Sequence, residues 1–404
     1  MAKDFNVAII GAGQAGLATS YHLTQAGVDH VVLDAGRVAE TWRSRRWDSF
    51  CLVTPNWTVQ LPGAPYAGPD PDGFIAKDAV VRHFETWAGS FNAPVREDCQ
   101  VAALEADGDS FVLSIPTGKL RARTVVIATG GYQRPHRPPG AEKVPKRIAQ
   151  VLGEEYRNEK GLPEGAVLVI GGGQTGCQIA EELHHAGRKV FLSCGRAPWA
   201  PRRMGGHDLV WWIVETGFWA RTMAQLPSPA ARLISNPLTT GHGGGRDLHY
   251  RTLHEMGVEL LGRFAGAEDG TVHFDDDLAK SMQAGDDLTR VFMEWVVELC
   301  ENRGLDVPWE VPGPASLTSR TALELDREGL TTVIWTTGFR PEYGWVHAPV
   351  FDDMGFPVQI DGRSDVPGLY FMGVHFQRKG QSAVLYGVGE DAEIVATHIA
   401  ENRK

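Results

Sequence analysis

The sequence of 404 residues has few cysteines, and none of them has the spacing that zinc or redox sites use. They are scattered and odd in number, with no C-x-x-C pair: Cys51, Cys99, Cys177, Cys194 and Cys300. This pattern argues against a structural zinc site and a redox-active dithiol. The histidines lack ligand spacing as well, so we expect no metal. Unpaired cysteines of this kind predict a reducing, cytoplasmic location.

Long apolar runs and basic runs are also missing. No stretch is apolar for the length that a membrane-spanning helix needs, and the apparent strand at the N-terminus leaves no room for a signal peptide. The net charge is −11 and no RNA-binding signature occurs. We therefore expect neither a membrane nor a nucleic acid as partner.

What the sequence does contain begins at its N-terminus, with a pattern typical of dinucleotide binding. An apolar run at residues 7–10 leads into Gly11, Gly13 and Gly16, which follow G-x-G-x-x-G spacing, and residues 17–26 read as a helix. Gly11 allows the tight turn, Gly13 lets a pyrophosphate approach the backbone, and Gly16 lets the helix lie close to the strand.

An acid completes this pattern. Asp34 ends a second apolar run at residues 31–33, where a carboxylate can accept both ribose hydroxyls. The alternative is a glycine-rich turn that binds nothing. Strand, helix, second strand and acid are all in register, so we interpret the segment as a dinucleotide site.

The same pattern returns in the middle of the chain. Residues 167–170 lead into Gly171, Gly173 and Gly176, followed by a helix and a strand at residues 189–193. Two such units in one chain are a far more specific signal than one.

The two units differ where the ribose would bind. The spacing from Gly11 to Asp34 equals that from Gly171 to Cys194, so a neutral residue replaces the acid. An acid would repel a 2′-phosphate, whereas a guanidinium pairs with it. Three arginines follow: Arg196, Arg202 and Arg203. The first unit therefore suits FAD and the second suits NADPH better than NADH, although a surface arginine can also be simply solvated.

The rest of the chain predicts an α/β fold in which the second Rossmann-like domain is inserted into the first. Three short strands at residues 101–104, 111–115 and 120–123 predict a meander, before an apolar strand at 125–130 and a proline-rich crossing. The strand at residues 332–338 would be the exit. We expect an FAD domain at residues 1–161 and 336–404, and an NADPH domain at 162–335. A partly helical insertion would span 204–314, with four aromatic residues on one helix face: Trp211, Trp212, Phe218 and Trp219.

The chain as a whole resembles the class B flavin-dependent monooxygenases, especially the bacterial branch similar to plant YUCCA-type enzymes. Besides the arginines after Ser193, the matching segments are GAGQAG, TWRSRRWDSFCLVTPNW, VIATGGYQRP, EYRN, VLVIGGGQTG, VIWTTGFRPEY and GLYFMGVHFQRKGQSAVLYGVGEDA. The resemblance implies a flavoprotein oxidoreductase that uses FAD, NADPH and O2. Its members form a C4a-(hydro)peroxyflavin and transfer one oxygen atom to a small organic substrate.

The resemblance also implies roles for individual residues. FAD would be held by Gly11, Gly13, Gln14, Gly16 and Asp34, and lined by Thr41, Trp42, Asp48, Thr129, Gln381 and Ser382. NADPH would be held by Gly171, Gly173, Gln174, Gly176, Arg196, Arg202 and Arg203. Asn56 would lie beside the reacting oxygen as the catalytic residue, and the competing interpretation is a turn asparagine that bonds its own backbone.

One motif of that family is largely absent. Its identifier F-x-G-x-x-x-H-x-x-x-Y/F would end at Tyr156, and Lys146, Ile148 and Leu152 replace its Phe, Gly and His. The Baeyer–Villiger identifier is absent too, so N- or S-oxygenation or side-chain oxidation is favoured over ring-ketone oxidation. Two alternatives stay open: a reductase that passes electrons to an acceptor, and a non-enzymatic flavin-binding subunit. The chain could also assemble as a homodimer.

Overall fold

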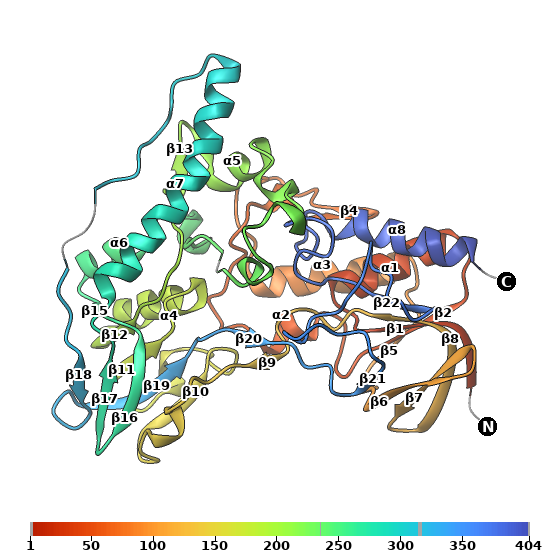
Figure 1. Cartoon of the computed structure of the whole chain (residues 1–404), viewed down its shortest axis with the longest axis horizontal. Helices are drawn as coiled ribbons and strands as arrows, with labels where there is room; N and C mark the ends of the chain where they lie inside the picture. Colours follow the sequence, from red (N-terminus) through yellow and green to blue (C-terminus); the bar gives the residue numbers. More distant parts are fainter. Residues whose placement is uncertain (1–2, 235, 314–316, 403–404) are drawn as a thin grey trace.

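The computed structural model describes residues 3–234, 236–313 and 317–402 of the chain. Two regions of sheet and helix lie side by side along the longest axis of the molecule (Figure 1). The chain forms one region from its N-terminus, crosses to the other, and returns to the first for its C-terminal helix. We call these regions the first domain and the second domain.

The first domain is built on an eight-stranded sheet with parallel strands at its centre. Strand β1 runs parallel to β2 and β8, and Ile10 lies opposite Leu33 and Ile127. The ends of these strands are apolar and buried, as expected for parallel strands covered on both faces. The strands, in order across the sheet, are β21 (Val346–His347), β6 (Ala103–Asp107), β7 (Ser110–Ile115), β8 (Gly118–Ile127), β1 (Lys3–Ile10), β2 (His30–Leu33) and β5 (Val95–Arg96), with β22 (Leu369–Phe371) beside β8.

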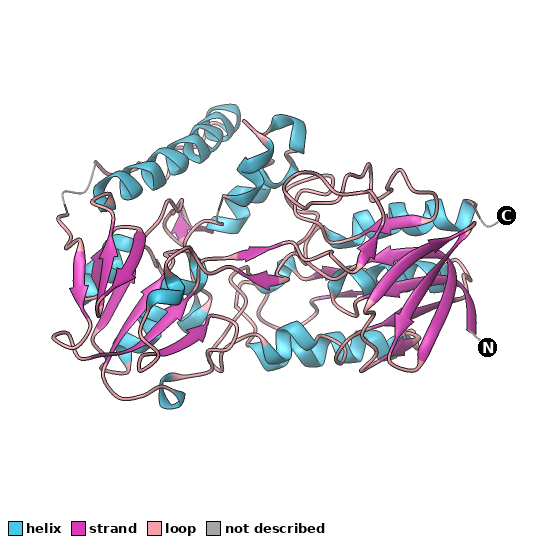
Figure 2. Ribbon diagram, turned by 60° about the horizontal axis from the view of Figure 1, so that its bottom comes forward, coloured by secondary structure: helices cyan, strands magenta, loops and turns pink. Residues whose placement is uncertain are grey.

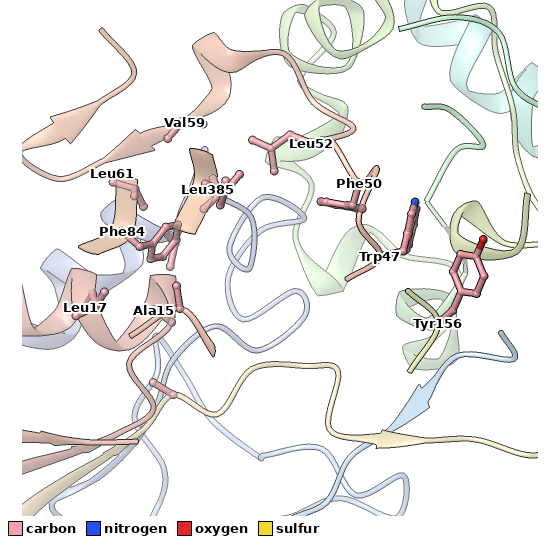
Figure 3. Packing of buried hydrophobic residues seen from close by; sticks show 14 of the residues in the cluster. Ala15, Leu17, Trp47, Phe50, Leu52, Val59, Leu61, Phe84, Tyr156 and Leu385 are labelled. Carbon is pink, nitrogen blue, oxygen red and sulfur yellow. The ribbon is translucent and has the colours of Figure 1, made fainter. Parts of the chain in front are cut away.

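Three helices of the first domain share one buried cluster beside this sheet. They are α1 (Gln14–Gln25), α3 (Lys77–Ser90) and α8 (Val388–Glu401). Figure 3 shows Leu17 of α1, Phe84 of α3 and Leu385, just before α8, among the buried side chains that hold them together. This packing fixes the N-terminus of α1 at the carboxyl ends of β1, β2 and β8.

The predicted meander is present, but its last strand is longer than expected. We assigned residues 120–123 and 125–130 to two strands, but the structure has one continuous strand, β8, which ends at Ile127. Its first half pairs with β7 in antiparallel fashion, its second half pairs with β22, and β1 pairs in parallel with both halves. The chain does not turn between the two halves, which agrees with the absence of Gly or Pro from residues 120–127.

The second domain contains a five-stranded parallel sheet. Its order is β10 (Ala149–Leu152), β19 (Leu330–Trp335), β11 (Ala166–Ile170), β12 (Val190–Ser193) and β15 (Glu259–Leu261). Helix α4 (Gln174–His185) follows β11, and α6 (Tyr250–Met256) precedes β15. A smaller antiparallel sheet adds β16 (Phe264–Glu268), β17 (Thr271–Phe274) and β18 (Ala322–Glu324).

Two of the predicted boundaries need correction. Strand β10 lies within residues 1–161, which we assigned to the first domain, but it pairs with β19 of the second sheet. The chain therefore crosses before residue 149. Strands β15, β16 and β17 lie within residues 204–314 but belong to sheets of the second domain, so that range is not one continuous insertion.

The helical part of the insertion also differs from the prediction. Trp211 and Trp212 lie on α5 (Leu209–Glu215), whereas Phe218 and Trp219 lie on a separate turn of 3-10 helix, Phe218–Ala220. The long helix α7 (Leu278–Arg303) follows Asp277. Trp212 and Phe292 of α7 belong to one buried cluster, so the aromatic residues serve core packing.

Both crossings between the domains run side by side. Strand β9 (Arg134–Pro135) pairs in antiparallel fashion with β20 (Phe339–Arg340), and Figure 2 shows this two-stranded ribbon between the domains. The predicted α/β fold with two Rossmann-like units, one inserted into the other, is thus confirmed. The remaining short elements are α2 (Glu40–Ser44), β3 (Gln60–Leu61), β4 (Ala64–Pro65), β13 (Arg203–Met204), β14 (His207–Asp208) and the 3-10 turns Asn56–Thr58, Ala141–Lys143, Glu159–Gly161, Met223–Gln225, Pro229–Leu233 and His242–Gly244.

Candidate functional site

The three glycines of the first loop have different surroundings, which separates structural roles from a binding role. A Cβ at Gly11, whose φ is +112°, would overlap the carbonyl oxygen of Ala128. A Cβ at Gly16 would overlap the carbonyl oxygen of Gly11. A Cβ at Gly13 would meet nothing within 4 Å. Since Gly13 is the N-cap of α1 without a side-chain cap, the open space lies where a phosphate would meet the free helix N–H groups.

Asp34 lies at the carboxyl end of β2, beside this loop. Its carboxylate accepts hydrogen bonds from the backbone N–H groups of Ala12, at 2.6 Å, and Gly36, at 2.8 Å. Burial raises the pKa of Asp34, and the two N–H donors oppose that shift. Each carboxylate oxygen has further lone pairs, so the group can still accept the two hydroxyls of a ribose.

The second glycine loop repeats this arrangement. A Cβ at Gly171 would overlap the carbonyl oxygen of Thr336, and one at Gly176 would overlap that of Gly171. A Cβ at Gly173, the N-cap of α4, again meets nothing within 4 Å. The residues present therefore fit two dinucleotides, one at each helix N-terminus.

The three arginines predicted for the 2′-phosphate have very different environments. Arg196 is exposed and has no hydrogen bond or ion pair with another described residue. Arg203 is exposed and donates to the carbonyl oxygens of Gly244 and Gly245. Both could turn toward a phosphate beyond the end of β12.

Arg202 does not fit the predicted role, because its guanidinium is buried and fully used. The residue is 1% exposed, and it pairs with both carboxylate oxygens of Asp208, at 2.7 and 3.0 Å. It also donates to the carbonyl oxygen of Val53, at 2.7 Å, and to Oγ1 of Thr239, at 2.8 Å. We therefore remove Arg202 from the candidate phosphate ligands.

Some predicted FAD-lining residues remain available to a ligand. Thr129 follows β8 and is exposed, and its Oγ1 accepts a hydrogen bond from Gln133. Thr41 and Trp42 lie on α2, where Thr41 is exposed and Trp42 is partly so. Gln14 at the start of α1 donates to the carbonyl oxygen of Ala383, at 2.7 Å. This bond holds the loop before α8 against the first glycine loop.

Other predicted residues are engaged with protein groups. Asp48 accepts from Nδ2 of Asn158, at 2.6 Å, and pairs with Lys77; the Asn158 bond comes first among the causes that lower the pKa of Asp48. Buried Ser382 accepts from the backbone N–H groups of residues 378 and 379. Ser382 thus shapes its loop rather than presenting a free group, whereas the carboxylate of Asp48 is exposed and can accept further hydrogen bonds.

Two more predicted residues position loops through single hydrogen bonds. The backbone N–H of Gln381 donates to the carbonyl oxygen of Trp219, at 3.0 Å. Nε2 of Gln174 donates to the carbonyl oxygen of Pro237, at 2.7 Å. Both bonds place segments of the insertion beside a dinucleotide loop.

Asn56 has the environment of its alternative interpretation. The residue is 2% exposed, its Oδ1 accepts from the backbone N–H of Ile75, at 2.7 Å, and its Nδ2 donates to the carbonyl oxygen of Asp70, at 2.8 Å. These bonds tie two stretches of one loop together. The geometry thus supports a structural asparagine and does not support the catalytic role.

Sequence reasoning missed a carboxylate at the junction of the domains. Glu182 of α4 accepts hydrogen bonds from the hydroxyl of Tyr156, at 2.7 Å, and from the hydroxyl of Ser49. Figure 3 shows Tyr156 beside Trp47 and Phe50 of the first domain. These bonds give a structural reason for the one identifier position that the sequence retains. No spacing in the sequence connects the three residues.

No cluster of three or more His, Cys, Asp or Glu side chains among the described residues is placed to hold a metal ion. None of the helices in residues 3–234, 236–313 and 317–402 combines the length and the apolar character of a membrane span.

Comparisons with known proteins agree with this architecture. Residues 8–213 match the family model of the pyridine nucleotide-disulphide oxidoreductases. A Geobacillus kaustophilus protein named as an uncharacterized CzcO-like oxidoreductase is 30% identical over 401 residues, covering 98% of each chain. The indole-3-pyruvate monooxygenase YUCCA4 of Oryza sativa is 29% identical over 240 residues, 52% of this chain and 54% of that protein. The solved flavin-containing monooxygenase from Stenotrophomonas maltophilia is 19% identical, with a TM-score of 0.66 and 99% of both chains covered.

Proposed function

The chain belongs to the pyridine nucleotide-disulphide oxidoreductase family, and on that basis we propose that it is an FAD- and NADPH-dependent monooxygenase resembling the class B flavin monooxygenases. FAD lies in the first domain and NADPH in the second. The substrate is a small organic molecule, which receives one atom of O2 on nitrogen, sulfur or a side-chain carbon.

The observation that carries the proposal is the pair of open glycine positions, Gly13 and Gly173, each at the N-terminus of a helix. Bound FAD would accept a hydride equivalent from NADPH and react with O2. The protein's own part is to bind the two phosphate groups, to orient the rings and to exclude water. Asp34 receives the ribose of FAD, and Arg196 pairs with the 2′-phosphate of NADPH.

Exclusion of water is supported by the contacts of the loop before α8. The backbone N–H of Gly380 donates to the carbonyl oxygen of Arg221, at 2.9 Å, so the insertion lies on this loop. The ring of Tyr386 contacts Trp57 of the first domain and Trp219 of the insertion, each with 6.0 Å between ring centroids. These aromatic side chains cover the segment that leads into α8. Exclusion of water from a site limits the hydrolysis of reactive intermediates.

A reductase is the second candidate, since the same pair of domains can serve electron transfer. An internal dithiol would favour it, but all five cysteines are free and well separated along the chain. A non-enzymatic flavin-binding subunit remains the third. A cytoplasmic location and a homodimer remain expectations that accompany the proposal.

The test is an aerobic assay with NADPH, FAD-loaded protein, ¹⁸O2 and panels of amines, sulfides and side-chain substrates. A monooxygenase gives a product that carries one ¹⁸O atom for each NADPH consumed. If NADPH is oxidised only when an electron acceptor is present, and no product gains ¹⁸O, the reductase replaces our proposal. If NADPH is never oxidised, the non-enzymatic subunit does.

A further inference from the structure

The acid of the first dinucleotide site also has a structural task. Asp34 accepts a hydrogen bond from the N–H of Ala12 in the glycine loop and another from Gly36 beyond β2. The carboxylate therefore ties the glycine loop to the end of the second strand. Any site that replaces the acid has to make this tie in another way.

In the second site, Cys194 occupies the position of the acid. The surrounding backbone is the same: Gly171 N–H donates to Ser193, as Gly11 N–H donates to Leu33. The thiol of Cys194, however, is buried and lies 3.5 Å from the carbonyl oxygen of Leu192. It makes no bond to the glycine loop.

Tyr250, the first residue of α6, supplies the tie from a different element. Its hydroxyl oxygen lies 2.8 Å from the carbonyl oxygen of Gly172 and 2.9 Å from that of Gly195. It also accepts from the N–H of Gly195, at 3.3 Å. The hydroxyl has a single proton, which it can donate to only one of the two carbonyl oxygens at a time. Because these contacts lie on Gly172 and on Gly195, the hydroxyl joins the glycine loop to the end of β12.

The loop sequence leaves room for this hydroxyl. Gly172 corresponds to Ala12 of the first loop, and a Cβ at Gly172 would overlap the hydroxyl of Tyr250. The tyrosine is 5% exposed, and burial first, then Cys194 and Cys177, raise its pKa well above the usual value. The hydroxyl of Tyr250 is therefore protonated and uncharged near neutral pH.

The carboxylate of Asp34 and the hydroxyl of Tyr250 differ in charge. A carboxylate at the end of β12 would repel a 2′-phosphate, whereas a neutral phenol does not. The N–H of Gly172, unlike that of Ala12, has no hydrogen-bond partner among the described residues, and exposed Arg196 follows Gly195. We propose that Tyr250 is a positioning residue that sets dinucleotide specificity: its neutral hydroxyl replaces the tie made by Asp34 and leaves the ribose end open to a 2′-phosphate.

This inference rests on the proposed function, because it assumes that the second site binds NADPH. The rival explanation is that Tyr250 simply fills the core. A phenylalanine would fill the same space, so Tyr250→Phe removes only the hydroxyl. The probes are adenosine 2′,5′-bisphosphate and 5′-AMP, whose binding to the FAD-loaded protein is measured by titration calorimetry.

We expect Tyr250→Phe to weaken adenosine 2′,5′-bisphosphate binding by about tenfold, the effect of about one hydrogen bond. Binding of 5′-AMP changes by less than about threefold, because 5′-AMP lacks the 2′-phosphate that the end of β12 would receive. Tyr156→Phe is the matched control, since it removes a buried tyrosine hydroxyl that bonds Glu182 instead; it should leave both affinities unchanged.

Equal losses for both probes, or no loss for either, would overturn the specificity role. If Tyr250→Phe does not fold, Gly172→Ala tests the same contact from the other side and should give the same selective loss; an unchanged preference there overturns the inference. If wild-type protein binds neither bisphosphate nor NADPH, the failure lies with the proposed NADPH site.

Discussion

Removing the Arg202 side-chain charge distinguishes a structural guanidinium from a phosphate ligand. Arg202→Met keeps much of the side-chain volume but leaves the carboxylate of Asp208 without its partner. The side chains of Arg202 and Asp208 are 2% and 9% exposed, and breaking a buried pair in this way costs about 3–5 kcal/mol. The carbonyl of Val53 and the hydroxyl of Thr239 lose a donor as well.

The assay compares urea unfolding of Arg202→Met with that of Arg203→Met, whose guanidinium is exposed and bonds only loop carbonyls. Because multidomain proteins need not unfold in one step, the first transition is compared. It should move to clearly lower urea for Arg202→Met and hardly move for Arg203→Met. Adding Asp208→Asn to Arg202→Met should recover part of the loss, since the amide is neutral and its oxygen can still cap α5.

Kinetics give the refuting result for this prediction. Since Arg202 touches no open space, its loss should affect NADPH and NADH use equally. If Arg202→Met unfolds like wild type but loses efficiency with NADPH alone, the guanidinium binds phosphate and our reading of its contacts is wrong.

Four further predictions concern the sites and the stability of the fold. Gly13→Ala should abolish FAD binding while the apoprotein keeps its melting temperature, because the methyl enters space reserved for the ligand; flavin absorbance after reconstitution measures this. Arg196→Ala should reduce kcat/KM for NADPH roughly ten- to a hundredfold, which corresponds to a loss of about 1.5–3 kcal/mol of transition-state stabilisation. The kcat/KM for NADH should stay nearly unchanged. Asn56→Ala should destabilise the protein by about 1–3 kcal/mol, because buried backbone groups lose their partners; unchanged stability with increased release of hydrogen peroxide would instead restore its catalytic role. Burial lowers the pKa of His249 to about 4, so the unfolded chain takes up a proton near pH 6.5 that the folded protein refuses; stability should fall as the pH drops from about 6.5 to 4, and urea midpoints of His249→Gln should fall less.

Controls for these predictions come from neighbouring positions. Gly16→Ala should damage folding itself, because its Cβ overlaps the backbone of Gly11. If Gly13→Ala behaves in the same way, the first loop is only structural. If Arg196→Ala affects both nucleotides alike, the phosphate is held elsewhere. A pH profile that His249→Gln does not change would assign the acid sensitivity to another group.

The dinucleotide loops could be predicted because their requirements are local. Turn, close approach and helix packing at Gly11, Gly13 and Gly16 are set within one strand–turn–helix unit, and the same holds for the second copy. Asp34 was found for the same reason, since one strand fixes its distance from the loop.

Residues whose partners are distant in the sequence could not be placed. Whether Arg202 points to solvent or to the core depends on Asp208, in the next strand of a hairpin, and on Val53, 149 positions away. Tyr250 contacts Gly172 across 78 positions. Strand β10 was missed because the prolines before it suggested irregular structure. Its pairing partner, β19, is distant in the sequence, so no local pattern indicates the pairing.

The two-stranded ribbon of β9 and β20 has a mechanical consequence. A single connecting strand allows two domains to rotate relative to each other, whereas two hydrogen-bonded strands resist twisting about their common axis and can still bend. The hydroxyls of Ser49 and Tyr156 that donate to Glu182, and the bond from Arg202 to the carbonyl oxygen of Val53, provide further attachments. We therefore expect relative motion of the two nucleotide sites to be limited to small opening and closing movements.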